Sequence, residues 1–319
     1  MTRRALVTGA GGFVGAGITH RLVEEGHEVT AVVGPGADFW RLGDLFASVE
    51  QVEVDLREPA AVAEAFRGAR PEWVFHLAAH GGYSWQTDRR RIFESNVLGT
   101  INVLEGAETA KSEAILIAGS SSEYGMKDHA PAESEQLEPN SDYAVAKAAA
   151  TLLASHLGRE RGLPVATLRL YSVFGPFEDP DRFIPTLVVH ALRGELPPLV
   201  DPAIARDFVY LDDVVHAFLL AATRGVTPGD VFNVGTGTET TIAEAVDAAR
   251  RTLGVEAAAQ WGSMSARDWD THRWVSDSTR IRSELGWEPA VAFDEGLART
   301  AAWLQGREDL WLRYGLKSE

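Results

Sequence analysis

The stretch that decides the fold is Gly9-Ala10-Gly11-Gly12-Phe13-Val14-Gly15, whose glycines have the spacing GxxGxxG. It follows a short apolar run, Ala5–Thr8, and opens an amphipathic segment, Phe13–Glu25. Glycines let the backbone turn tightly and let a pyrophosphate approach the amino end of a helix, where exposed N–H groups and the helix dipole favour anions. A glycine-rich turn alone is weak evidence, but a strand before it and a helix after it are the required context. The stretch therefore predicts a dinucleotide site at Gly9, Gly12, Phe13, Val14 and Gly15.

The following chain continues this alternation. Further apolar or β-branched runs read as strands: Val29–Val33, Val49–Val54, Trp73–Leu77, Ala114–Ala118 and Val165–Tyr171. The segments between them have helical patterns: Pro59–Arg67, Arg89–Ala110 and Tyr143–Arg161. Repeated βα alternation implies an α/β fold of the Rossmann type, a doubly wound parallel sheet with helices on both faces.

After Gly175 the pattern becomes irregular and Pro-rich, which indicates a second, smaller C-terminal α/β lobe. We expect residues 1–171, with about 207–236, to form the dinucleotide-binding domain. Residues of about 172–206 and 237–319 are expected to form the second lobe. The chain shows no clean linker between the two.

Composition limits the classes of partner. The 319 residues carry a formal net charge of -16, with a pI near 5.0, so nucleic acid and anionic membranes would be repelled. The absence of cysteine excludes disulfides, thiolate zinc sites and a cysteine nucleophile. The amino terminus has too short an apolar run for a signal peptide, and no run reaches membrane-spanning length. We therefore expect a cytoplasmic protein.

A second motif, Tyr143-Ala144-Val145-Ala146-Lys147, places a phenol and an ammonium four residues apart, on one face of a helix. An ordinary surface pair would have the same spacing. A nearby ammonium, however, stabilises a phenolate and lowers the phenol pKa, and it can also hold a ribose hydroxyl. The motif predicts Tyr143 as an acid or base near neutral pH.

The order of the motifs resembles that of the extended short-chain dehydrogenase/reductases that act on nucleotide sugars. The resemblance covers nearly the whole chain and is more specific for the family than for the reaction. It rests on the glycine loop, Asp55, His76-Leu77-Ala78-Ala79, Asn96-Val97-Leu98-Gly99-Thr100, Gly119-Ser120-Ser121-Ser122-Glu123-Tyr124-Gly125, Tyr143 with Lys147, Arg206-Asp207-Phe208-Val209-Tyr210, Arg267-Asp268-Trp269-Asp270, Trp274-Val275-Ser276-Asp277 and Leu285-Gly286-Trp287-Glu288-Pro289.

The resemblance implies roles for residues of the first domain. Ser120 stands where the family has its catalytic Ser or Thr, whose hydroxyl binds the substrate oxygen beside the tyrosine. Lys147 would bind the nicotinamide ribose, and Asn96 would lie behind it in a supporting network. Residues at strand ends would line the cofactor: Asp55, Leu56, Leu77, Ala78 and Ala79. The Asp55 carboxylate would accept from the adenine amino group, although a solvated aspartate at a strand end is an equal alternative.

The resemblance also implies a substrate, a nucleoside-diphosphate sugar. Arg206 and Arg267 match arginines that bind its diphosphate, a task suited to bidentate charge-assisted bonds, although each arginine is also a candidate structural ion-pair partner. Ser172 stands where relatives commonly have an Asn directed at the diphosphate. Tyr83 is expected to line the sugar pocket, with a place in the core as the alternative.

The serine cassette limits the reaction. In the nucleotide-sugar 4,6-dehydratases, an Asp or Ser and then a Glu typically follow the catalytic hydroxyl, whereas this chain has Ser121 and Ser122. A hydroxyl cannot replace a carboxylate as general base. Glu123, one residue further along a strand, is expected to face the opposite side. Elimination of water is therefore disfavoured, and Ser121 and Ser122 are expected to contact the substrate or to satisfy backbone groups.

The end of the second predicted strand bears on the cofactor. NAD-using relatives have an acidic residue there that binds the adenosine ribose, whereas this chain has Val33-Gly34-Pro35. Arg41 is close enough in sequence to bind a 2′-phosphate, with help from Arg3 or Arg4, although Arg41 is also a candidate for a solvated helix residue. This pattern favours NADP over NAD.

The leading hypothesis from sequence is a 4-ketoreductase of a nucleoside-diphosphate 4-keto-6-deoxyhexose. In it, Tyr143 protonates the C4 oxygen that Ser120 orients. A 4-epimerase with tightly bound NAD uses the same residues and is the alternative, followed by a 4,6-dehydratase. A non-catalytic nucleotide sensor is the alternative from another class. By analogy with the family, we expect a homodimer formed through Arg89–Ala110 and Tyr143–Arg161.

Overall fold

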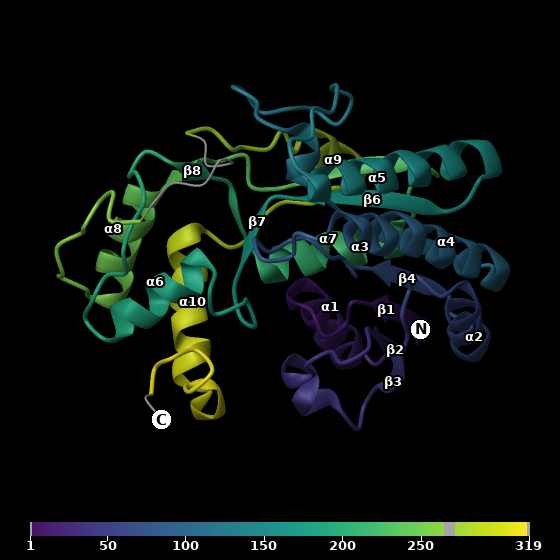
Figure 1. The fold of residues 1–319 in the computed structure, drawn as a ribbon, viewed down its shortest axis with the longest axis horizontal. Helices are drawn as coiled ribbons and strands as arrows, with labels where there is room; N and C mark the ends of the chain where they lie inside the picture. The colour runs from purple at the N-terminus through teal and green to yellow at the C-terminus, as the bar shows by residue number, and fades with distance from the viewer. Residues whose placement is uncertain (1, 265–271, 318–319) are drawn as a thin grey trace.

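The structure, a computed structural model, describes residues 2–264 and 272–317 and has two lobes (Figure 1). The larger lobe is built on a seven-stranded sheet in which every pair of neighbouring strands is parallel. In spatial order its strands are β10 (Asp230–Val234), β6 (Val165–Leu170), β5 (Ala114–Ser120), β4 (Trp73–His76), β1 (Arg4–Thr8), β2 (Glu28–Val33) and β3 (Glu50–Glu53). The expected Rossmann-type fold is confirmed.

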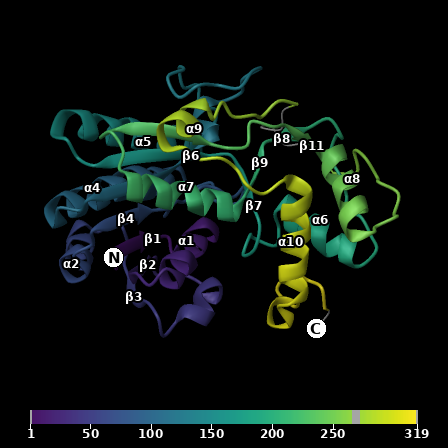
Figure 2. The ribbon, with the colours of Figure 1, turned by 180° about the vertical axis from the view of Figure 1, so that it is seen from behind.

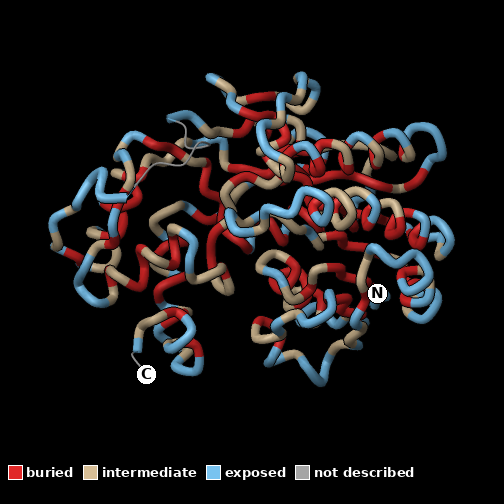
Figure 3. The backbone as a smooth tube through the Cα atoms, in the orientation of Figure 1, coloured by how far each residue is buried: buried red, intermediate tan, exposed pale blue. Residues whose placement is uncertain are grey.

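The central strands are buried on both faces, which is why their sequences are continuous apolar runs rather than alternating ones (Figure 3). The helices of the larger lobe that flank them are α1 (Phe13–Glu24), α2 (Pro59–Ala69), α3 (Arg89–Phe93), α4 (Gly99–Ala110), α5 (Asp142–Arg161), α7 (Leu211–Arg224) and α9 (Thr279–Leu285). Short turns of 3-10 helix are η1 (Trp40–Leu45) and η3 (Ser121–Tyr124), and η2 (Glu94–Leu98) is a π-helical segment.

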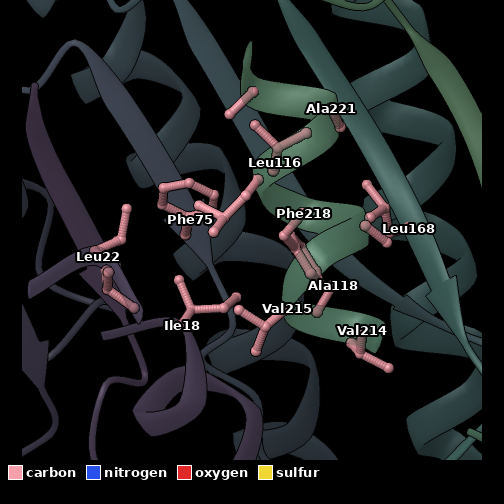
Figure 4. Packing of buried hydrophobic residues seen from close by; sticks show 14 of the residues in the cluster. Ile18, Leu22, Phe75, Leu116, Ala118, Leu168, Val214, Val215, Phe218 and Ala221 are labelled. Carbon is pink, nitrogen blue, oxygen red and sulfur yellow. The ribbon is translucent and has the colours of Figure 1, made fainter. Parts of the chain in front are cut away.

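Each face of the sheet has its own core. On one face, α1, α7 and α9 pack on the strands, and Ile18, Phe75, Leu116 and Phe218 meet there (Figure 4). Figure 2 shows α7 in front of the sheet on this side. On the other face, the apolar side chains come from α2, α4 and α5. Two separate cores therefore hold the strand ends in fixed positions, where the candidate site lies.

The smaller lobe has a third core, built mainly from α6 (Phe183–Leu192), α8 (Ile242–Leu253) and α10 (Phe293–Gln305). A last 3-10 turn, η4 (Glu308–Leu310), follows α10. Two further sheets have two strands each: β7 (Ser172–Phe174) pairs with β9 (Phe208–Tyr210), and β8 (Ala205–Arg206) pairs with β11 (Thr240–Thr241).

Two sequence expectations differ from this arrangement. The segment Arg89–Ala110, expected as one helix, is interrupted by η2, which adds a wider turn at the position of Asn96. The predicted lobe boundaries also assign α9 to the second lobe, but Ile281 and Leu285 of α9 pack in the core that α1 and α7 form on the sheet. Among the described residues, no helix is both long and apolar enough to cross a membrane.

Candidate active site

The glycine loop lies between β1 and α1 and has no room for side chains. Gly9 has a φ of +68°, and a Cβ on it would lie 2.6 Å from the backbone nitrogen of Ala78. A Cβ on Gly15 would overlap the carbonyl group of Gly9. Gly12 is the N-cap of α1, and no side chain caps the helix there. The backbone N–H groups of Phe13 and the next residues of the first turn are therefore open to another acceptor. These features fit the pyrophosphate of a dinucleotide.

The other residues expected to line the cofactor lie at the same edge of the sheet. Leu77, Ala78 and Ala79 follow β4, and Ala78 packs against Gly9. After β3, the carbonyl group of Leu56 accepts a bond from Asn102 Nδ2 at 2.7 Å. The Asp55 carboxylate is bound by the side chain of Arg57 at 2.6 Å, which lowers the Asp55 pKa. Asp55 is thus paired but remains partly accessible.

Arg41, the residue expected to bind a 2′-phosphate, binds backbone groups of the chain itself. Its side chain is buried against the face of Trp40, and its guanidinium donates to the carbonyl oxygens of Phe177 at 2.7 Å and Gly11 at 3.2 Å. Asp179 lies 3.9 Å from it. The guanidinium therefore fastens the segment after β7 to the glycine loop.

Arg3 and Arg4, the other cations considered for a 2′-phosphate, lie at the beginning of β1. Both bind Glu72, at 2.8 and 3.4 Å. The amino ends of parallel strands lie at the opposite edge of the sheet from the glycine loop. These two arginines therefore do not lie where they could contribute to cofactor binding.

Asn96 binds the loop after β4. Its amide group donates to the carbonyl oxygen of His80 at 2.7 Å and accepts from the His80 backbone N–H at 2.8 Å. Nearby, the buried imidazole of His76 binds the hydroxyls of Thr8 and Thr100 at 2.7 and 2.9 Å. Asn96 thus fixes the loop after β4, and its role in a network behind Lys147 stays a prediction.

Ser120, Tyr143 and Lys147 are brought together at the carboxyl ends of the strands. Ser120 is the last residue of β5, and the other two lie in the first turns of α5. The helix begins there because the Ser141 side chain accepts from the backbone N–H of Ala144. Lys147 Nζ donates to the carbonyl oxygen of Ala118 at 2.6 Å. Burial lowers the pKa of Lys147 to about 8.

The expected lowering of the Tyr143 pKa was wrong for this structure. Burial of the phenol raises its pKa to about 12, and the negative charge of Glu123 acts in the same direction. The nearby Arg182 and the Ser120 hydroxyl lower it by less. The Lys147 ammonium donates to a backbone carbonyl, and burial of the ring is the largest cause of the shift in the Tyr143 pKa.

The three serines of the cassette have three different partners. Ser120 is the N-cap of η3, and its hydroxyl lies next to Tyr143. Ser122 Oγ lies 2.7 Å from Ser120 Oγ, and its backbone N–H donates to the same oxygen at 3.2 Å. Ser121 Oγ accepts from Trp274 Nε1 at 3.0 Å. Neither Ser121 nor Ser122 brings a carboxylate to the site.

Glu123 points into the core below the serines. Its carboxylate is fully buried and accepts from the Ser120 backbone N–H at 2.8 Å, from Thr151 Oγ1 at 3.0 Å and from Arg169 Nε at 2.8 Å. The expectation that Glu123 faces away from the site agrees with this, but the reason is different. A 3-10 turn, not an extended strand, directs the side chain inwards.

The candidate substrate residues lie where the lobes meet. Tyr83 donates to Asp179 Oδ2 at 3.2 Å. Ser172, in β7, donates its backbone N–H to the carbonyl oxygen of Asp207 at 3.0 Å. The guanidinium carbon of Arg206 lies 5.8 Å from the centre of the Trp274 ring. Arg267 lies outside the described residues.

Sequence reasoning missed Arg182. Its guanidinium covers the Tyr83 ring at 4.8 Å and donates to the carbonyl oxygen of Gly82 at 2.9 Å. An ideal Cβ on Gly82 would lie 4.0 Å from the Tyr143 ring, so this contact adjoins the catalytic candidate. The only signal in the sequence was a single arginine in a Pro-rich connection, which does not point to a partner a hundred residues away.

The sequence profile of the NAD dependent epimerase/dehydratase family matches residues 5–235. The dTDP-glucose 4,6-dehydratase of Streptomyces griseus is 32% identical over 98% of this chain and 97% of its own. The UDP-glucose 4-epimerase of Mycolicibacterium smegmatis is 30% identical over 95% of this chain and 99% of its own.

Among solved structures, a UDP-glucose 4-epimerase of Thermus thermophilus in complex with NAD has a TM-score of 0.84 and 30% identity. The match covers 95% of this chain and 99% of that one. The family profile and these near full-length relatives all describe enzymes. The resemblance deduced from the motifs is therefore confirmed. The chain belongs to the NAD-dependent epimerase/dehydratase family.

Proposed function

We propose that this protein inverts the configuration at C4 of a nucleoside-diphosphate hexose, with NAD as cofactor. The observation that carries this proposal is the site itself: Ser120, Tyr143 and Lys147 converge, while hydroxyls occupy positions 121 and 122. Hydride chemistry at one carbon needs nothing more from the protein. Relatives named as epimerases and dehydratases move epimerisation ahead of the ketoreduction that sequence alone ranked first.

In the proposed reaction, Tyr143 removes the proton of the C4 hydroxyl. It returns a proton to the C4 oxygen after the sugar has rotated so that its other face meets the cofactor. The Ser120 hydroxyl binds that oxygen and orients it. The glycine loop would hold NAD, which would supply reversible hydride transfer at C4. Lys147 would bind the ribose hydroxyls of the cofactor. Burial raises the pKa of Tyr143 to about 12, so the phenol acts as a base near neutral pH only when a positive charge beside it favours the phenolate.

Dehydration is disfavoured by the partners of the cassette. A 4,6-dehydratase needs an acid and a base near C5 and C6 in addition to the hydride chemistry. Ser121 is bonded to Trp274, and Ser122 to Ser120. Glu123, the nearest carboxylate in sequence, is buried in an ion pair with Arg169. None of these can abstract a C5 proton.

NAD fits the site better than NADP. The preference for NADP rested on Arg41, Arg3 and Arg4, and the bonds of all three direct them elsewhere. The dinucleotide would lie on the glycine loop, with its adenosine near Asp55 and Leu56. Arg206, and Arg267 by resemblance, would bind the diphosphate of the sugar nucleotide, with Ser172 and Tyr83 beside it.

A 4-ketoreductase remains the second candidate because of one observation. β2 ends at Val33 and is followed by Gly34, so no carboxylate directly follows it to repel a 2′-phosphate. One experiment separates the two. UDP-glucose, UDP-galactose and their dTDP counterparts are incubated with the purified protein and catalytic NAD, and the products are separated by anion-exchange chromatography.

Formation of the C4 epimer without net reduction of NAD supports the epimerase. A parallel incubation contains a nucleoside-diphosphate 4-keto-6-deoxyhexose and NADPH. Consumption of one NADPH for each such sugar, with no epimer formed from the hexose nucleotides, would replace the proposal by the reductase. Release of a 4-keto-6-deoxy product from the glucose nucleotide would replace it by the dehydratase. Tyr143→Phe serves as the control for contaminating activity.

We also propose a homodimer. Leu152 of α5 is 59% exposed and Leu98, at the end of η2, is 51% exposed. α5 and η2 are in contact, and Val145 of α5 is a third exposed apolar residue. A second copy of the chain that packed on this face would remove all three side chains from water.

A further inference from the structure

Trp274 makes a contact between distant parts of the chain that no role described so far explains. Its indole Nε1 donates to Ser121 Oγ at 3.0 Å, across 153 residues of sequence. Ser121 is the first residue of η3 and directly follows Ser120. We propose that Trp274 is a positioning residue, which ties the serine turn to the second lobe and so keeps the Ser120 hydroxyl in place beside Tyr143. This role rests on the proposed function of the site.

The segment that carries Trp274 is bonded on both sides. The backbone N–H of Trp274 donates to Glu239 Oε1 at 3.2 Å, and Arg273 Nε lies 3.3 Å from the same oxygen. Glu239 directly precedes β11, which pairs with β8. On the other side, Arg273 Nη1 donates to the carbonyl oxygen of Asp128 at 2.8 Å. Two adjacent residues therefore join the second lobe to the stretch from Ser121 to Asp128.

The serine turn is closed by its own hydrogen bonds, so a displacement at Ser121 is passed to its neighbours. Ser120 Oγ accepts from the Ser122 backbone N–H, and Glu123 Oε1 accepts from the Ser120 backbone N–H, which together form a capping box. Glu123 anchors this turn in the core through Arg169. The turn is thus held at two points, the core and Trp274. Loss of the second point loosens the turn without removing the first.

The chemistry of the contact explains why tryptophan suits this position. An indole N–H can only donate, so Ser121 Oγ accepts, and the hydroxyl hydrogen of Ser121 is directed elsewhere. Ser121 is buried, which makes an unsatisfied oxygen there costly. Because the reacting atoms must be held within a fraction of an ångström of the productive geometry, loosening this turn affects the chemical step more than substrate binding.

Trp274→Phe removes the N–H donor and keeps an aromatic ring. Trp311→Phe is the matched control, because Trp311 is also half-buried and its Nε1 donates to the carbonyl oxygen of Leu304 at 2.9 Å, away from the serine turn. We expect Trp274→Phe to lower kcat by about 2- to 10-fold, the range for one neutral hydrogen bond, with KM within about twofold of wild type. Ser121→Ala should cause a similar loss, and the double variant should lose no more than the single variants.

Wild-type kcat in Trp274→Phe, an equal loss in Trp311→Phe, or additive losses in the double variant would each overturn the inference. A second measurement does not depend on turnover. Hydrogen exchange followed by mass spectrometry should show faster exchange over residues 119–125 in Trp274→Phe and not in Trp311→Phe. Equal protection there would overturn the inference even if the proposed reaction were correct. Wild-type protein that acts on no nucleotide sugar, with the exchange difference present, would refute only the proposed function.

Discussion

The buried ion pair below the serine turn allows a prediction with a definite magnitude. Arg169 Nε lies 2.8 Å from Glu123 Oε2, and the two side chains are 3% and 0% exposed. Arg169 Nη1 also donates to the Tyr124 hydroxyl at 2.7 Å, and the guanidinium covers the Tyr124 ring at 4.6 Å. Arg169→Met fills much of the same volume and removes the charge. It leaves the Glu123 carboxylate inside the protein without its counter-ion.

Removing one partner of a buried ion pair costs about 3 to 5 kcal/mol, because the remaining charge has lost its compensation. The bonds from Ser120 and Thr151 to the carboxylate remain, so we expect the lower half of this range. The free energy of unfolding is measured by urea denaturation. Arg251→Met is the control, because Arg251 forms an exposed ion pair with Asp294 at 2.8 Å. Its free energy of unfolding should change by at most about 1 kcal/mol.

The paired variant Glu123→Met with Arg169→Met tests the cause. With both charges removed, the free energy of unfolding should lie closer to wild type than in Arg169→Met alone. An Arg169→Met protein within about 1 kcal/mol of wild type would refute the reasoning. So would a double variant that is less stable than Arg169→Met, because the penalty would then come from lost packing and not from an unpaired charge.

The other predictions concern the cofactor, the reaction, pH and assembly. Tyr143→Phe should abolish turnover and leave NAD affinity, measured by calorimetry, within about twofold. Gly15→Ala should abolish NAD binding in the same assay, because a Cβ would overlap the Gly9 carbonyl group; unchanged affinity would contradict this. Burial lowers the pKa of His76 from 6.5 to about 3, so its contribution to stability is full above pH 6.5 and is lost as the pH falls towards 3. The free energy of unfolding should therefore be about 2 kcal/mol lower at pH 5, and His76→Asn should flatten this dependence in urea titrations. Leu152→Asp should shift the protein to the monomer in sedimentation experiments, and an unchanged mass would contradict the proposed dimer face.

The sequence predicted those features that depend on local chain geometry. The glycine loop between β1 and α1 was evident because a strand, a glycine-rich turn and a helix follow one another directly. The helix over Tyr143 and Lys147 was evident because its residue pattern is likewise local. The bonds of Arg41 could not be predicted because its partners, Gly11 and Phe177, are 30 and 136 residues away, and no pattern within a few residues of Arg41 indicates them.

The pKa shifts at the site also could not be predicted from the sequence. From spacing alone, an ammonium four residues from a phenol lowers its pKa. In the folded chain, burial outweighs this effect and raises the pKa of Tyr143, while the Lys147 ammonium donates to Ala118. The sign of a pKa shift depends on how much water each group loses, and that quantity is a property of the packed core rather than of the sequence interval.

The serine cassette shows how three identical residues acquire different tasks. Ser120 caps a turn and lies beside Tyr143, Ser121 accepts from Trp274, and Ser122 binds back to Ser120. Their order along the chain gives them different directions, and the partners that they meet come from α5 and from the connection before α9. Because each hydroxyl is already engaged, replacing Ser121 and Ser122 with Asp and Glu would not by itself create a dehydratase. A side chain at position 121 would still meet the indole of Trp274, so the chemistry of the cassette depends on the second lobe as well.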